Sequence, residues 1–121
     1  MASTSADPRQ VAIVARDLIV ATRIADAAEA AGYLPARVDE PGRLPTPSAV
    51  AVAFVDWSDR EPGWGAKLRG WQAEATGGPP RIVLFGPHTD LAAHDDARAS
   101  GLGPMMARSK LFASLPSLMR R

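Results

Sequence analysis

The sequence contains no cysteine, which excludes disulfide bonds, thiolate catalysis and zinc sites built on thiolates. It also lacks an apolar stretch long enough to span a membrane. Its net charge is only +1, so no electrostatic attraction to nucleic acid or to an anionic membrane is expected. Neither a Walker loop nor a serine nucleophile elbow is present. The sequence therefore does not predict an enzyme.

The composition is that of a globular domain, with 46% hydrophobic and 22% charged residues. A chain of 121 residues is long enough for one hydrophobic core and too short for two. The opening MASTSADPRQ has neither a basic start nor an apolar segment, so it is not expected to be a secretion signal. We predict a flexible tail over residues 1–9, one domain over residues 10–121, no cofactor and a cytoplasmic location.

Five segments have the apolar, often β-branched character of buried parallel strands. Pro35 and Pro104 cannot donate a backbone hydrogen bond, which predicts that the second and fifth strands lie at the sheet edges. The third segment is the most apolar and is therefore expected at the centre. The predicted strands cover residues 11–15, 33–38, 49–55, 81–86 and 104–109.

Helical patterns lie between most of these strands, whereas residues 39–48 contain three prolines and are not expected to form a stable helix. The alternation predicts an α/β fold: a three-layer, flavodoxin-like sandwich with a five-stranded parallel sheet in the order 2-1-3-4-5. The tryptophans of the second helix are interpreted as core residues. The predicted helices run from Asp17 to a stop at Gly32, along the face marked by Trp64, Leu68, Trp71 and Ala75, from Thr89 or Asp90 through Ser100, and within residues 110–121.

The third predicted strand ends in a carboxylate, Asp56, within VAFVDWSDR. In doubly wound folds the working site lies at the carboxyl ends of the strands, near the first and third. The motifs AAEAAGY, VDW and ARASG, in this order and spacing, resemble the receiver domains of bacterial response regulators, the CheY-like family. The resemblance covers nearly the whole chain. It implies a CheY-like fold in which Asp56 occupies the place of the phosphoacceptor.

The same resemblance implies three kinds of partner for that aspartate. An acidic pair after the first strand would hold a divalent cation, a hydroxyl would follow the fourth strand, and a lysine would follow the fifth. Here the acidic pair falls on Ala15 and Arg16, with only Asp17 next to them, and a methyl group and a cation cannot ligate Mg²⁺. We therefore expect no metal site. Arg16 is expected either to pair with Asp56 or to point into solvent.

The two remaining positions depart from the pattern as well. The hydroxyl position falls on Gly86, and the lysine position falls on Arg108, with Lys110 available only if the strand end is shifted. The receiver's second helix is reduced to the proline-rich segment. We expect Leu44 to fold over the sheet face left thinly covered there, or that face to be a contact surface.

These departures favour a stand-alone pseudo-receiver that acts through protein partners or self-association and is not switched by phosphorylation. Two alternatives stay open: a receiver still phosphorylated on Asp56, and a flavodoxin-like binder of a small ligand or metal. Asp90 and His94, with His88 nearby, have a spacing that can bind a metal. The competing interpretation of these three residues is a solvated helix start.

The resemblance also implies a partner face on the fourth helix, fifth strand and fifth helix of a receiver. Pro116 is expected to leave the segment KLFAS irregular, so that Leu111 or Phe112 projects outward as an anchor, the alternative being that both fill the core. Methionine, an aromatic ring and arginines suit an interface. The expected face comprises His94, Arg98, Met106, Arg108, Lys110, Leu111 and Phe112.

Overall fold

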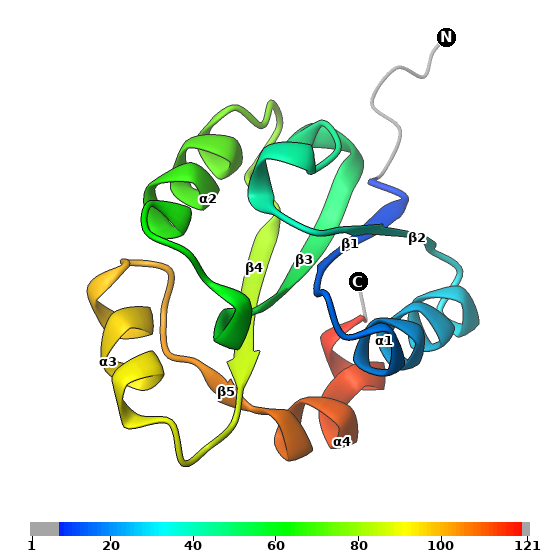
Figure 1. Cartoon of the computed structure of the whole chain (residues 1–121). Coiled ribbons are helices and arrows are strands. Elements are labelled where there is room, and N and C mark those ends of the chain that lie inside the picture. The colour runs from blue at the N-terminus through cyan, green and yellow to red at the C-terminus, as the bar shows by residue number, and fades with distance from the viewer. Residues whose placement is uncertain (1–7, 120–121) are drawn as a thin grey trace, which may run out of the picture.

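A computed structural model describes residues 8–119 of the chain, so residues 1–7 of the predicted tail lie outside the described part. Five parallel strands form one sheet in the order β2-β1-β3-β4-β5 (Figure 1). This is the predicted order, with the two proline-containing segments at the edges. The strands are β1 (Gln10–Val14), β2 (Leu34–Val38), β3 (Val50–Asp56), β4 (Arg81–Gly86) and β5 (Met106–Ala107).

Helices cover both faces of the sheet and make a three-layer sandwich (Figure 1). One face is covered by α1 (Leu18–Ala30) and α4 (Arg108–Leu118), which contact each other. The other face is covered by α2 (Trp64–Ala73) and α3 (Leu91–Ala99). The predicted α/β class and flavodoxin-like topology are therefore confirmed.

Local sequence signals set the ends of these helices. The Asp17 side chain caps α1 by accepting hydrogen bonds from the backbone N–H groups of Ile19, at 3.0 Å, and Val20, at 3.3 Å. Gly32 follows the helix with φ of 89°, a left-handed conformation that glycine adopts without steric cost. Asp90 caps α3 in the same way, by accepting from the N–H of Ala93. Each cap agrees with its prediction.

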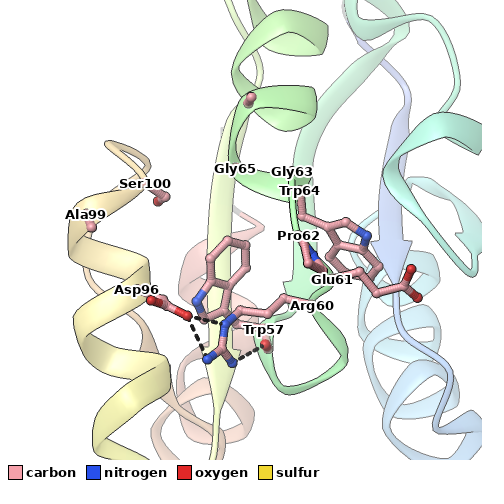
Figure 2. A pocket seen from close by; sticks show the side chains of 11 residues that line it. Trp57, Arg60, Glu61, Pro62, Gly63, Trp64, Gly65, Asp96, Ala99 and Ser100 are labelled. Atoms are coloured by element: carbon pink, nitrogen blue, oxygen red, sulfur yellow. Dashed lines mark hydrogen bonds and ion pairs between the residues drawn. The ribbon is translucent and has the colours of Figure 1, made fainter.

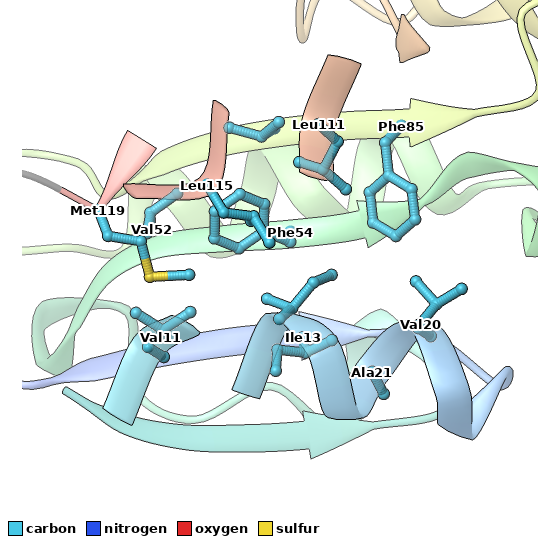
Figure 3. Packing of buried hydrophobic residues seen from close by; sticks show 14 of the residues in the cluster. Val11, Ile13, Val20, Ala21, Val52, Phe54, Phe85, Leu111, Leu115 and Met119 are labelled. Atoms are coloured by element: carbon cyan, nitrogen blue, oxygen red, sulfur yellow. The ribbon is translucent and has the colours of Figure 1, made fainter. Parts of the chain in front are cut away.

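The core lies mainly between the sheet and the α1–α4 layer (Figure 3). Phe54 and Phe85 point from β3 and β4 into this layer, and Ile13 meets them from β1; all three are fully buried. On the opposite face Trp64 and Trp71 are also buried. The tryptophans are thus core residues, as predicted.

The proline-rich connection contains no α-helix. It forms two short 3-10 turns, η1 (Pro41–Arg43) and η2 (Pro47–Ala49). Leu44, between them, packs against the buried clusters of the α2 face, and the indole N–H of Trp71 donates to the Pro45 carbonyl at 2.7 Å. The loop therefore folds over the face left by the missing helix, which is one of the two predicted outcomes.

The last part of the fold corrects two predictions. The fifth strand has only two residues, paired with Phe85 and Gly86, instead of spanning residues 104–109. The segment KLFAS is not irregular, because α4 runs unbroken from Arg108 through Pro116. Leu111 is fully buried and does not project outward, whereas Phe112 is partly buried against the same cluster. Burial of Leu111 and Leu115 on one helical face outweighs the single hydrogen bond lost at proline.

Candidate functional site

Asp56 ends β3 and is the only buried charged residue in the described part of the chain, with 1% of its surface exposed. One carboxylate oxygen, Oδ1, accepts from the backbone N–H of Ser58 at 3.1 Å and from the Ser58 hydroxyl at 2.5 Å. The other oxygen, Oδ2, lies 3.5 Å from the Arg108 guanidinium. Both oxygens are therefore engaged by groups of the chain itself.

The Ser58 contact has a local cause. The Asp56 side chain caps the 3-10 turn η3 (Trp57–Asp59), in which an Asp-x-Ser sequence lets the carboxylate accept from the N–H two residues ahead. Asp56 thereby holds the loop that leaves the strand. This structural use was not part of the prediction, although the Asp-x-Ser pattern in the sequence would have indicated it.

The environment raises the pKa of the Asp56 carboxyl above its ordinary value. Burial is the main cause, because the charged form loses its hydration, and the charge of Asp59 adds to it. The hydrogen bonds from Ser58 and the charge of Arg108 oppose this shift without cancelling it. The chain thus holds Asp56 as a desolvated carboxylate and not as a solvated, strongly acidic one.

Arg16 does not pair with Asp56, so that prediction was wrong. Its side chain pairs with Glu61 at 2.5 Å, and its backbone N–H donates to Asp59 at 3.0 Å. The Glu61 carboxylate is the main cause of a raised Arg16 pKa. The side chain is about half exposed, yet two contacts fix this part of the chain beside the loop of η3. The alternative, in which Arg16 points into solvent, agrees with its exposure, although the side chain also pairs with Glu61 at the surface.

The residues present do not fit the Mg²⁺ ion that the receiver resemblance implies. Ala15 is fully buried and offers only a methyl group and a carbonyl, which accepts from Arg37 at 2.9 Å. The Asp17 carboxylate is used as the cap of α1. Within residues 8–119, no group of three or more histidine or acidic side chains is arranged to hold a metal. Mg²⁺ needs several oxygen ligands, and the strand ends do not present them.

Gly86 stands where a receiver would carry a hydroxyl. A Cβ added to Gly86 would lie 2.8 Å from the sulfur of Met105, which is 5% exposed, and 3.8 Å from the N–H of Ser58. The space beside Gly86 is therefore filled by a core side chain. Nothing in the sequence pattern around Met105 indicated this contact, because it depends on how the short β5 approaches β4.

Arg108 lies at the start of α4 and reaches Asp56, whereas Lys110 is exposed. The pairing brings the predicted lysine-position residue to the carboxylate. It also removes Arg108 from the expected partner face. Of that face, Arg98 and Lys110 are exposed, while His94 and Met106 are half-buried. Phe112 is half-buried too, and the Arg23 guanidinium lies 3.8 Å from the centre of its ring.

The histidines do not assemble into a metal site. The Asp90 carboxylate is occupied as the cap of α3. The His94 Nε2 atom lies 3.1 Å from the His88 carbonyl oxygen, a contact within the helix start. The geometry agrees with the solvated helix start and does not bring His88, Asp90 and His94 into one ligand set.

No protein-family model and no curated protein matches the sequence. No helix within residues 8–119 is long and apolar enough to cross a membrane. Solved structures do match. A response regulator from Thermotoga maritima is 13% identical, with a TM-score of 0.62 over 91% of this chain and 96% of that one. A response regulator receiver protein from Burkholderia phymatum is 15% identical, with a TM-score of 0.58 over 91% and 94%.

The third match is the pilus assembly protein CpaE from Caulobacter crescentus. It is 19% identical, with a TM-score of 0.53 over 92% of this chain and 94% of that one. At these identities the likeness concerns the fold. The chain has the flavodoxin-like, CheY-like fold of response-regulator receiver domains.

Proposed function

We propose that this chain is a receiver-fold regulatory module that works through protein contacts and is not switched by Mg²⁺-dependent phosphorylation of Asp56. The observation that carries the proposal is the state of Asp56 itself. Its two oxygens are engaged by Ser58 and Arg108, and it is 1% exposed. A nucleophile must instead reach the phosphorus atom in line with its leaving group.

Charge supports the same conclusion. Transfer of a phosphoryl group to a carboxylate brings negative charges together, and this charge has to be neutralised by a cation. After β1, Ala15 and Arg16 carry no carboxylate, the Asp17 carboxylate caps α1, and Arg16 is turned toward Glu61. Among the cations of residues 8–119, only Arg108 pairs with the carboxylate. At the position of the receiver's hydroxyl, Gly86 offers no side chain, and the Met105 side chain fills the space beside it.

The test is incubation with Mg²⁺ and either beryllofluoride or acetyl phosphate, followed by intact-mass measurement and a ¹H–¹⁵N NMR spectrum. We expect no added phosphoryl mass and no shifts in the loop of η3. Asp56→Asn is the matched control, because it keeps an acceptor oxygen for Ser58 while removing the nucleophile. An adduct that forms on the natural chain and is absent from Asp56→Asn would refute the proposal in favour of a phosphorylated receiver.

The partner contact is assigned to the end of the molecule formed by α3, β5 and the start of α4 (Figure 1). Arg98 and Lys110 are exposed there, and Met106 and Phe112 are half-buried. Methionine and aromatic side chains are typical of the core of a protein interface, and exposed cations are typical of its rim. Arg108 takes no part, since it is committed to Asp56.

Charge reversal at Arg98 and Lys110 tests this surface without disturbing the core. We expect the double variant to fold normally and to lose self-association in light scattering, or to lose a partner found by capture from the source cells. Reversal of Arg9 and Lys67, both exposed and outside α3, β5 and α4, is the matched control. Unchanged association in the Arg98 and Lys110 variant would place the interface elsewhere.

A further inference from the structure

A cavity of about 530 Å³ lies between α3 and the start of α2 (Figure 2), and Asp56 is not among the residues that line it. This volume lies within the range of small-molecule sites. Its wall includes Trp57, Arg60, Gly65, Asp96 and Ser100. The cavity is largely open to solvent, so a ligand can enter without any rearrangement of the backbone.

The indole of Trp57 has an unpaired hydrogen-bond donor, which points to a binding site. Trp57 is 3% exposed, and its Nε1 atom is buried with no hydrogen-bond partner. Figure 2 shows this nitrogen at the edge of the ring that faces Asp96 and α3. The side chain of Trp71 offers a contrast, because its N–H donates to the Pro45 carbonyl. A buried N–H without a partner is rare in proteins, and here it faces a cavity.

Other donors converge on the same space. The Arg60 guanidinium reaches the Trp57 carbonyl at 3.2 Å and the Asp96 carboxylate at 2.8 Å. The helix α2 begins beside it, and its N-cap, Gly63, has no side chain to cap the first turn. The first helical hydrogen bond of α2 runs from the Lys67 N–H to the Gly63 carbonyl, and the Trp64 N–H donates to the Glu61 carbonyl. The Gly65 and Ala66 amides of the first turn are left to face the cavity region.

The acids near the cavity do not cancel this donor character. Asp96 is paired with Arg60, and Glu61 is paired with Arg16. The close approach of α2 and α3 is also built into the sequence. A Cβ on Gly65 would lie 3.1 Å from the Cβ of Ser100, so a larger residue would push the two helices apart and deform the cavity.

We propose that this cavity binds a small organic anion, a carboxylate or phosphate group joined to a compact body. The anionic group lies at the start of α2 between Arg60 and the indole N–H of Trp57, and the body contacts the small residues of α2 and α3. The ligand contacts the Arg60 N–H groups that the Asp96 carboxylate and the Trp57 carbonyl leave free, so that the Arg60–Asp96 pair is kept. Because Trp57 directly follows Asp56, binding acts on the loop that leaves β3. The inference does not depend on whether Asp56 is phosphorylated.

The experiment uses the indole N–H signals of the three tryptophans in a ¹H–¹⁵N spectrum. Adenosine monophosphate and benzoate probe the two anion chemistries, and adenosine and benzamide are their neutral counterparts, all at constant ionic strength. We expect a saturable shift of the Trp57 signal with at least one anion and with neither neutral compound. The Trp71 signal is the internal control. A Trp57→Phe variant assigns the Trp57 signal.

A pair of variants then tests the assignment of Arg60. Arg60→Gln is expected to lower the affinity for the anion about tenfold, which is the effect of losing one charge-assisted hydrogen bond. Arg98→Gln, on α3 and paired only loosely with Asp95 at 3.7 Å, is expected to bind like the natural chain. A response to one anion alone identifies which of the two chemistries the site takes. The inference is overturned if neither anion moves the Trp57 signal, if the neutral compounds move it equally, or if Arg60→Gln binds unchanged. A phosphoryl adduct at Asp56 would refute the proposed function and leave this inference standing.

Discussion

Replacement of Asp56 by asparagine should leave the protein as stable as the natural chain near neutral pH, or more stable. Two opposing effects decide this. The Arg108 guanidinium lies 3.5 Å from the carboxylate, and an ion pair at that distance gains about 5 kcal/mol at an effective dielectric constant of about 20. Solvent screens this gain, since about a third of the Arg108 side chain is exposed. Burial of the carboxylate costs several kcal/mol, and the raised pKa indicates that this cost dominates.

The pH dependence gives the sharper measurement. A carboxyl whose pKa is higher in the folded state binds more protons there, so stability falls as pH rises from the unfolded pKa of about 3.9 through the folded pKa. The natural chain should therefore gain stability relative to Asp56→Asn on acidification across this window. The gain is about 1.4 kcal/mol for each unit by which the two pKa values differ. Asparagine does not titrate, so the variant lacks this pH-dependent contribution to the free energy of unfolding.

Urea unfolding followed by tryptophan fluorescence, between about pH 4 and pH 8, measures the difference in the free energy of unfolding. Asp95→Asn, on the exposed face of α3, controls for the removal of one carboxylate. The reasoning is refuted if Asp56→Asn is strongly destabilising at neutral pH and its deficit shrinks on acidification. That result is the signature of a carboxylate whose pKa is lowered by folding.

Three further predictions concern the contacts around this site and the core. Arg108→Met should cost about 1–3 kcal/mol at neutral pH, because it leaves the buried carboxylate without its counter-charge, and the cost should shrink at acidic pH; urea unfolding across pH measures both. Trp71→Phe removes the hydrogen bond to the Pro45 carbonyl and should cost about 1 kcal/mol, with faster amide exchange confined to residues 41–49. Leu111→Ala should cost about 2–5 kcal/mol in thermal or urea unfolding, since Leu111 is fully buried in α4; a cost below 1 kcal/mol, as for an exposed residue, would contradict that placement.

Much of the fold follows from local properties of the sequence. Short apolar runs predict buried parallel strands, and Pro35 puts the second of them at an edge because proline cannot donate to a neighbour. Asp17 and Asp90 cap the helices that follow them. The lack of carboxylates at Ala15 and Arg16 can likewise be read directly, since no folding step creates a metal ligand from a methyl group.

The contacts of the site could not be predicted in this way, because they join residues far apart in the sequence. Arg16 and Arg108 both fall at receiver-site positions near Asp56. Packing of α4 against the sheet brings Arg108 into an ion pair with Asp56, whereas Arg16 forms an ion pair with Glu61. The filling of the space at Gly86 by Met105 depends on the approach of the short β5.

The course of the last helix was also decided by tertiary structure. Pro116 predicts an irregular segment on local grounds, but the helix continues because Leu111 and Leu115 are buried together against the sheet. The cavity beside Trp57 has the same origin, since its walls come from two helices that meet only in the folded chain. Local sequence thus determined the first four strands, the caps and the missing metal ligands. The partner of the buried carboxylate and the shape of the space around it were set by packing, because side-chain contacts across the sheet depend on the position of every layer at once.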